Sequence, residues 1–229
     1  MQSVIRSLVF YAVFYVATVL FVIAAQLALL FSVDAMRTVA NGWSAFHLAC
    51  VRYILGIEIV EQGDRPAGAA FYALKHESFF DALNLACVLP NPVAFAKVEL
   101  FKIPLWGRAA RAYGIVPVAR KEGAKALRFM LSETERLKAA GRTFVIFPEG
   151  TRVPHGRHPR LRPGFAALYK LLGLPVVPVA IDSGPLYAGV WKKRGTITLR
   201  FGEPIPPGLP REEIEQRVQA GINALNPAD

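Results

Sequence analysis

Cysteine is scarce in this sequence, and its two copies lie far apart. Cys50 and Cys87 form no C-x-x-C pair and no spacing typical of a zinc site, so the sequence predicts neither a disulfide framework nor a metal site. We expect both to be small buried side chains in a reduced, cytoplasm-facing protein. The motif G-x-S-x-G is also missing, which leaves a hydrolase without an evident nucleophile.

Acidic residues are few, and this shortage gives the chain a strong positive charge. The 229 residues hold 17 Asp and Glu against 27 Lys and Arg, for a formal net charge of +10. Hydrophobic residues make up 53% and the mean hydropathy is +0.33, which is more apolar than a typical soluble domain. A basic, apolar chain favours a membrane surface or a phosphorylated substrate as partner. Nucleic acid is disfavoured because the aromatic residues lie in apolar runs and not on a stacking platform.

The N-terminal segment contains no charged residue between Arg6 and Asp34. As a helix, the apolar run 8–31 would reach about 36 Å, against a hydrocarbon core of roughly 30 Å. A cleaved signal peptide is the alternative, but its apolar core would be about 7–15 residues long. We therefore expect a helix that spans the membrane or embeds deeply in it.

A second, amphipathic helix is predicted over residues 34–56, with His47 beside its apolar stripe as a packed or interfacial residue and not a ligand. Arg37 and Arg52 can lie at a headgroup boundary while their stems cover apolar surface. Residues 1–56 are therefore predicted to form a membrane anchor of two helices, whose orientation the sparse flanking charge does not reveal. The stripe recurs at steps of three and four residues and consists of Met36, Val39, Trp43, Phe46, Cys50 and Tyr53.

From residue 57 onward, short β-rich runs alternate with helical stretches. This alternation predicts an α/β domain over 57–229, with a mixed, largely parallel sheet flanked by helices. In such sheets ligands gather at the carboxyl ends of the strands. Polar loops follow three of the predicted strands, at 75–81, 147–152 and 182–185. The predicted strands are 57–61, 69–74, 143–147, 176–180 and 196–201, and the predicted helices are 122–141, 164–173 and 211–225.

His76 and Asp81 are the first candidate pair. On one continuous helix, positions five apart point about 140° away from each other, so the two side chains meet only if His76 lies in the loop and Asp81 in the first helical turn. Ser78 is a suitable N-cap, and Ser78 with Asp81 resembles a capping box, in which Asp81 only satisfies a backbone N–H. The functional alternative is a histidine base oriented by a carboxylate. Without an enzyme nucleophile, such a base would activate a hydroxyl group of the substrate.

The stretch 145–152 (VIFPEGTR) is the second candidate. Gly150 allows a positive φ or the close approach of a ligand, and the planar fork of Arg152 suits a phosphate. The structural alternative is a surface turn with a Glu–Arg pair. Further on, the acid-free basic loop 153–164 is a plausible docking place for an anionic lipid or an acidic carrier. Phe101, Leu105 and Trp106 are equally compatible with core packing and with contact to a membrane or an acyl chain.

Taken together, these stretches resemble the motifs of glycerolipid acyltransferases, in particular bacterial 1-acyl-sn-glycerol-3-phosphate acyltransferases of the PlsC type. The resemblance covers nearly the whole chain. One departure is Ala119, which stands where family members often carry an acidic residue. The stretches come in the family's order and are His76 with Asp81, Lys97 to Leu100 leading to Gly114–Arg120 (GIVPVAR), Phe147–Arg152 (FPEGTR) and Leu174–Pro178 (LPVVP).

The resemblance implies a membrane-bound enzyme that acylates the sn-2 hydroxyl of lysophosphatidic acid to give phosphatidic acid. The acyl donor would be an acyl-carrier-protein or coenzyme A thioester, with no cofactor or metal, and the site would face the cytoplasm from the cell membrane. It makes His76 the base and Asp81 its orienting acid. Alternatives are another lysolipid or glycerol 3-phosphate as acceptor, or a non-catalytic lipid-binding protein. The substrate-binding residues it implies are Lys97, Arg120, Glu149, Gly150, Thr151 and Arg152.

Overall fold

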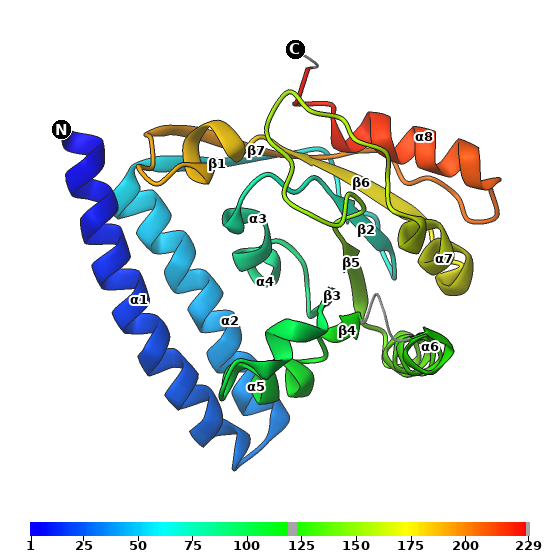
Figure 1. The fold of residues 1–229 in the computed structure, drawn as a ribbon, viewed down its shortest axis with the longest axis horizontal. Helices are drawn as coiled ribbons and strands as arrows, with labels where there is room; N and C mark the ends of the chain where they lie inside the picture. The colour runs from blue at the N-terminus through cyan, green and yellow to red at the C-terminus, as the bar shows by residue number, and fades with distance from the viewer. Residues whose placement is uncertain (119–122, 228–229) are drawn as a thin grey trace.

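The computed structural model describes residues 1–118 and 123–227, which fold into a sheet with helices on both faces (Figure 1). The described residues form a seven-stranded sheet in the order β1-β7-β6-β2-β5-β3-β4. Strands β6 and β7 pair antiparallel, and the other described pairs are parallel. The predicted mixed, largely parallel sheet is thereby confirmed. The strands are β1 (Ile57–Gln62), β2 (Phe71–Leu74), β3 (Pro92–Lys97), β4 (Val116–Val118), β5 (Thr143–Ile146), β6 (Val176–Ile181) and β7 (Gly195–Phe201).

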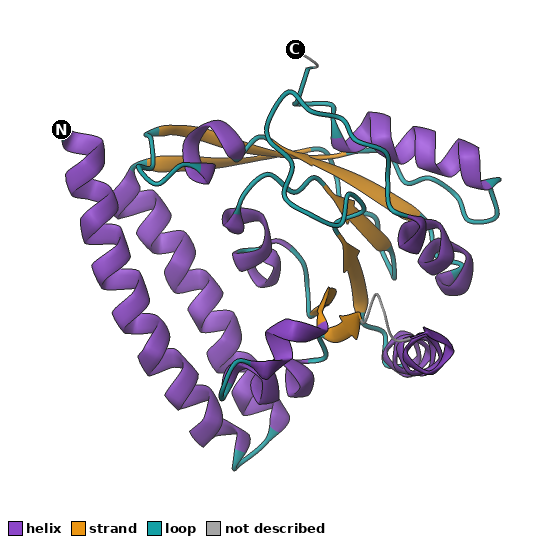
Figure 2. Cartoon of the chain, viewed as in Figure 1, coloured by secondary structure: helices purple, strands orange, loops and turns teal. Residues whose placement is uncertain are grey.

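The helices lie in two groups, one on each side of the sheet (Figure 2). The long hairpin of α1 and α2, with the short helices α3 and α4, covers one face, and α7 and α8 cover the other. The helices are α1 (Gln2–Leu29), α2 (Val33–Cys50), α3 (Phe79–Leu83), α4 (Leu85–Val88), α5 (Trp106–Tyr113), α6 (Gly123–Ala139), α7 (Pro163–Leu172) and α8 (Arg211–Ile222), and the short turns are η1 (Val51–Leu55), η2 (Val98–Lys102) and η3 (Gly184–Ala188).

Two hydrophobic cores result from this layering. On one face, Phe10 and Phe14 of α1 share a core with Leu74 of β2 and Val145 of β5. On the other face, Phe165 of α7 is fully buried in a second core with α8. Full burial of one such side chain contributes about 1.5–3 kcal/mol, so the N-terminal hairpin is packed onto the domain as part of its fold.

Helix α1 nevertheless remains largely uncovered along its outer side. Among the described residues it is the one helix long and apolar enough to cross a membrane. An 18-residue window of this helix has a mean hydropathy of 2.5, and 17% of that window is buried. The hairpin turns at Leu30 and Phe31, which are 71% and 86% exposed. Helix α2 then begins at Ser32, whose hydroxyl accepts a hydrogen bond from the Ala35 amide at 2.9 Å and so satisfies one of the helix's free N–H groups.

One sequence prediction about burial is wrong, that of Cys87. In the α2 stripe, Met36 and Cys50 are buried, whereas Tyr53 is 87% exposed. The chain widens into a π-helical turn at η1, which changes the angular step between residues and rotates Tyr53 off the stripe. Cys87 is exposed as well, because it lies about 200° around the short helix α4 from the buried Leu85.

Candidate active site

His76 and Asp81 lie at the carboxyl end of β2 and contact each other. His76 is in the loop that follows the strand, and Asp81 is in the first turn of α3. The imidazole Nδ1 is 3.2 Å from the Asp81 carboxylate Oδ2. Because an ionised carboxylate only accepts hydrogen bonds, Nδ1 donates and Nε2 keeps its lone pair for a proton. With 16% of its side chain exposed, His76 can meet a ligand.

Asp81 also caps helix α3, so both sequence interpretations hold at once. Its Oδ2 accepts hydrogen bonds from the amides of Glu77 at 2.7 Å and Ser78 at 2.8 Å, and Ser78 completes the capping box. Its Oδ1 accepts a hydrogen bond of 2.6 Å from the hydroxyl of Ser183, in the loop after β6. Four donors therefore fix the carboxylate in one orientation, and the carboxylate fixes the imidazole.

The turn Phe147–Arg152 lies against this pair. The Phe147 ring stacks on the His76 ring with centroids 4.0 Å apart and an interplanar angle of 22°. The Val153 amide donates to the His76 carbonyl at 2.7 Å. The exposed Arg152 guanidinium lies 4.0 Å from the centroid of the Phe79 ring, a cation–π distance. One positive group is therefore exposed on the turn that packs against the histidine loop.

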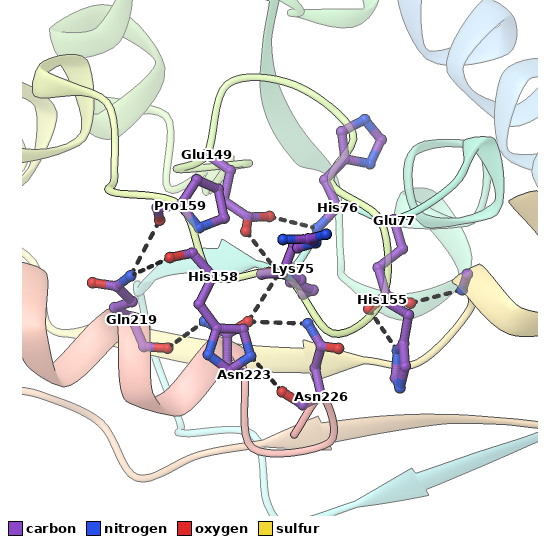
Figure 3. A network of polar contacts seen from close by, with 12 residues as sticks. Lys75, His76, Glu77, Glu149, His155, His158, Pro159, Gln219, Asn223 and Asn226 are labelled. Atoms are coloured by element: carbon purple, nitrogen blue, oxygen red, sulfur yellow. Dashed lines mark hydrogen bonds and ion pairs between the residues drawn. The ribbon is translucent and has the colours of Figure 1, made fainter. Parts of the chain in front are cut away.

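A buried lysine holds the backbone of the histidine loop in place (Figure 3). Lys75 Nζ donates to Glu149 Oε1 at 2.7 Å, to the Asn223 side chain at 2.8 Å and to the Arg157 carbonyl at 2.9 Å. These three acceptors match the three protons of an ammonium group. The other oxygen of Glu149 accepts a bond from the His76 amide at 3.4 Å. Burial raises the pKa of Glu149 above its usual value, and the bond from Lys75 opposes this rise.

Glu77 extends the network toward the basic loop. Figure 3 shows its side chain pointing away from His76. Its Oε1 faces His155 Nδ1 at 3.0 Å, and its Oε2 accepts a bond from the Gly184 amide at 2.7 Å. Burial raises the pKa of Glu77, while these two bonds lower it. His155 and His158 are thus bound to protein groups, the latter to the Asn226 carbonyl. Among the described residues, no three His, Cys, Asp or Glu side chains gather as a metal site would need.

The predicted phosphate-side residues divide into exposed and buried ones. Thr151 and Arg152 are exposed on the turn that packs against the histidine loop. Lys97 is exposed at the carboxyl end of β3, which lies at the same end of the sheet. Gly150 has a φ of 69°, so its expected positive φ is confirmed. Glu149 is buried and bonded to protein groups, which places it beneath the site. Strand β4 ends at Val118, and the predicted Arg120 and Ala119 lie outside the described residues.

Sequence reasoning missed three residues that shape the site. Lys75 directly precedes His76, and Ser183 and Asn223 lie more than a hundred residues after it yet contact this loop. Lys75 and Ser183 each had a signal, because they lie in polar loops that follow predicted strands, whereas Asn223 had none. Of the residues left open between core and surface, Phe101 is buried, Leu105 is 52% exposed and Trp106 is half-buried.

Comparison with known proteins places this geometry in context. A family model described as "Acyltransferase" matches residues 56–182, more than half of the chain. The chain is 28% identical to a 1-acyl-sn-glycerol-3-phosphate acyltransferase from Pseudomonas aeruginosa, covering 82% of this chain and 76% of that protein. It is also 30% identical to a chloroplastic 1-acyl-sn-glycerol-3-phosphate acyltransferase from Brassica napus. That match covers 56% of this chain and 36% of the relative.

A solved structure shares the fold. The crystal structure of the 1-acyl-sn-glycerophosphate acyltransferase PlsC from Thermotoga maritima superposes with a TM-score of 0.77. The match covers 98% of this chain and 95% of that one, at 23% sequence identity. The N-terminal hairpin and the seven-stranded domain therefore recur together in one arrangement.

Proposed function

Because the chain belongs to the acyltransferase family, we propose that it transfers a fatty acyl group from a thioester to the sn-2 hydroxyl of lysophosphatidic acid. The observation that carries the proposal is the contact of 3.2 Å between His76 and Asp81, beside the exposed Arg152. The names of the relatives from Pseudomonas aeruginosa and Brassica napus support the acceptor. The donor would be an acyl-carrier-protein or coenzyme A thioester.

The chemistry follows from the free lone pair on His76 Nε2. The acceptor hydroxyl gives its proton to Nε2 while its oxygen attacks the thioester carbonyl carbon. The C–S bond then breaks, and the leaving thiolate takes the proton back from the imidazolium. Asp81 stabilises the imidazolium during this step, and a positioned general base typically contributes about 10²–10⁴ in rate. The product is phosphatidic acid and a free thiol, so no protein nucleophile is needed.

The positive groups along this edge of the sheet would hold the phosphate of the acceptor. Arg152 projects beside the histidine, and Lys97 lies on β3, two strands away from β2. Neighbouring strands are about 4.8 Å apart, so β3 runs about 10 Å from β2. A lysophosphatidate whose hydroxyl reaches His76 would thus place its phosphate among cations. Such contacts supply mainly positioning.

The outer side of α1 supports membrane association of the enzyme. Its apolar residues are exposed along the helix, and leaving so large an apolar face in water is unfavourable. Embedding it in a bilayer would keep the site close to its lipid substrate. We propose the cell membrane as the location, with the site on the cytoplasmic side where the resemblance places it.

A donor-by-acceptor assay tests the proposal. Purified protein in detergent is supplied with acyl-carrier-protein or coenzyme A thioesters and with lysophosphatidate, glycerol 3-phosphate, another lysophospholipid or a lyso-ornithine lipid, and the products are identified by mass. We expect phosphatidic acid to form fastest, from one donor at least. No acylated product with any pair would contradict the proposal, as would release of free fatty acid at an equal rate without acceptor.

A further inference from the structure

A cavity of about 400 Å³ lies at the end of the sheet opposite the histidine site. Its walls come from α2, from the loop before β3, from the last turns of α6 and from Arg142. Arg142 directly precedes β5, whereas Phe147, which stacks on His76, directly follows it. At about 3.3 Å per residue, these two ends of β5 are roughly 16 Å apart. The cavity is therefore separate from the candidate active site.

Arg142 is a buried cation at the inner wall of this cavity. It is 7% exposed, and its Nε and Nη2 donate to the carbonyls of Asn91 and Tyr113, both at 2.9 Å. No carboxylate pairs with it among the described residues. Burial first, and then the charge of Arg37, lower the pKa of Arg142 below its ordinary value. An unpaired buried charge is unfavourable, so a counter-charge inside the cavity would stabilise it.

Two more guanidinium groups line the same cavity. Arg37 pairs through Nη1 with Asp34 at 2.9 Å, but that carboxylate is 88% exposed. The Arg37 Nε atom is buried and has no hydrogen-bond partner among the described residues. Arg136 pairs with Glu133 at 2.8 Å. Three guanidinium groups therefore lie around the cavity with two carboxylates, Asp34 in its lining and Glu133 beside Arg136, which leaves an excess of positive charge.

We propose that this cavity binds the phosphate group of an anionic phospholipid. Guanidinium forks match the oxygens of a phosphate in pairs. The position favours a lipid over a free phosphate, because Arg37 lies in the second turn of α2, six residues after Phe31 at the exposed hairpin tip. This choice of source rests on the membrane association proposed above. The site would hold the hairpin at the bilayer boundary without entering the reaction.

Binding of the full-length protein to vesicles tests this site. One set of vesicles is phosphatidylcholine alone, and the other also contains phosphatidylglycerol, which is anionic and is not the acceptor. The variants are Arg37→Gln and Arg136→Gln, while Arg142 stays intact because its bonds to Asn91 and Tyr113 hold the fold. Arg108→Gln is the matched control, since this exposed residue of α5 does not line the cavity. Helix α5 also lies beside the hairpin, because Gln26 of α1 donates to the carbonyl of Leu105 at the start of α5.

We expect phosphatidylglycerol to strengthen binding of the wild-type protein. The two cavity variants should lose about tenfold or more of this gain, since one hydrogen bond to a charged group is worth about 1.5–3 kcal/mol. The control should lose no more than about fivefold, the value of one diffuse surface charge. Equal losses in all three variants, or no gain in the wild type, would overturn the proposal. Inorganic phosphate that competes with the vesicles for the protein at constant ionic strength would overturn the lipid assignment. Acyl transfer to detergent-dispersed lysophosphatidate is measured separately, so that a failure of this proposal is distinguished from a failure of the proposed function.

Discussion

At the scale of single residues, the histidine site depends on one carboxylate that performs two tasks. The sequence left helix capping and histidine orientation as alternatives for Asp81. In the structure, Oδ2 accepts from the backbone amides of the capping box and also faces His76. Capping thus holds the carboxylate in the position from which it orients the histidine. Ser183 completes the arrangement by binding the other oxygen.

Ser183 is therefore expected to act as a positioning residue. Replacement by alanine leaves Asp81 Oδ1 without its donor, so kcat should fall on the order of tenfold, from a hydrogen bond worth about 1.5–3 kcal/mol. The KM for the acceptor should change little. Ser44→Ala is the matched control, because this buried serine donates to the Leu83 carbonyl at 2.7 Å and is not one of the donors to Asp81. The measurement is the initial rate of each variant. An equal loss of kcat in both variants would contradict the prediction and indicate that Ser183 has only a structural role.

At the scale of elements, His47 joins the N-terminal hairpin to the helix that carries Asp81. It is fully buried in α2, with Nδ1 3.1 Å from Asn84 Oδ1 and Nε2 2.7 Å from the Tyr187 hydroxyl. Asn84 ends α3, and Tyr187 belongs to η3, which follows Ser183. The sequence predicted a packed or interfacial histidine, and the structure shows a packed one. Its neutral ring therefore connects three elements around the site.

The burial of His47 predicts a loss of stability in acid. Burial is the main cause that lowers the pKa of His47 to about 4. The hydrogen bond with Asn84 opposes this shift of the pKa, and the charge of Lys192 adds to it. Between about pH 6.5 and pH 4, the unfolded chain binds this proton and the folded chain does not, so stability falls as the pH falls. The full loss is about 3 kcal/mol. Thermal unfolding across this range should show a declining Tm in the wild type and a flatter profile in His47→Gln, and parallel profiles would contradict the assignment.

The order and type of most elements could be predicted from the sequence, because their patterns are local. The strands later found as β1, β2, β5, β6 and β7 and the helices α1, α2, α6, α7 and α8 were all expected, with boundaries close to those observed. Strands β3 and β4 were not, since Pro92 and Pro117 lie within them and proline is uncommon in strands. The predicted single helix after Ser78 instead divides at Asn84, whose side chain donates to the Phe80 carbonyl.

The site was predictable where its residues are close in sequence and unpredictable where they are not. His76, Asp81 and Arg152 come from two short stretches with recognisable chemistry. The buried pair of Lys75 and Glu149 joins positions 74 residues apart, and Asn223 is 148 residues from Lys75. No local sequence pattern predicts such partners, because the strand order that brings them together is set by packing.

At the scale of the whole molecule, the N-terminal hairpin and the α/β domain form one folded body. The Lys192 amide bonds the Ser7 hydroxyl at 2.8 Å, and Phe10 of α1 stacks edge-on with Tyr187 at 6.1 Å. The hairpin expected over 1–56 therefore packs against the loop that supports Asp81, while its outer side stays apolar and exposed. Embedding that side in a bilayer would bring a rigid site to a lipid substrate.

The central claim is that one histidine, held by one carboxylate, takes the proton from the acceptor hydroxyl. The most direct measurement is the initial rate of phosphatidic acid formation by His76→Ala with both substrates saturating, beside His158→Ala as a matched histidine control. We predict a fall of about 10²–10⁴ for His76→Ala and a rate near that of the wild type for the control, with unchanged thermal unfolding in both. A folded His76→Ala protein that keeps near wild-type turnover would contradict the account.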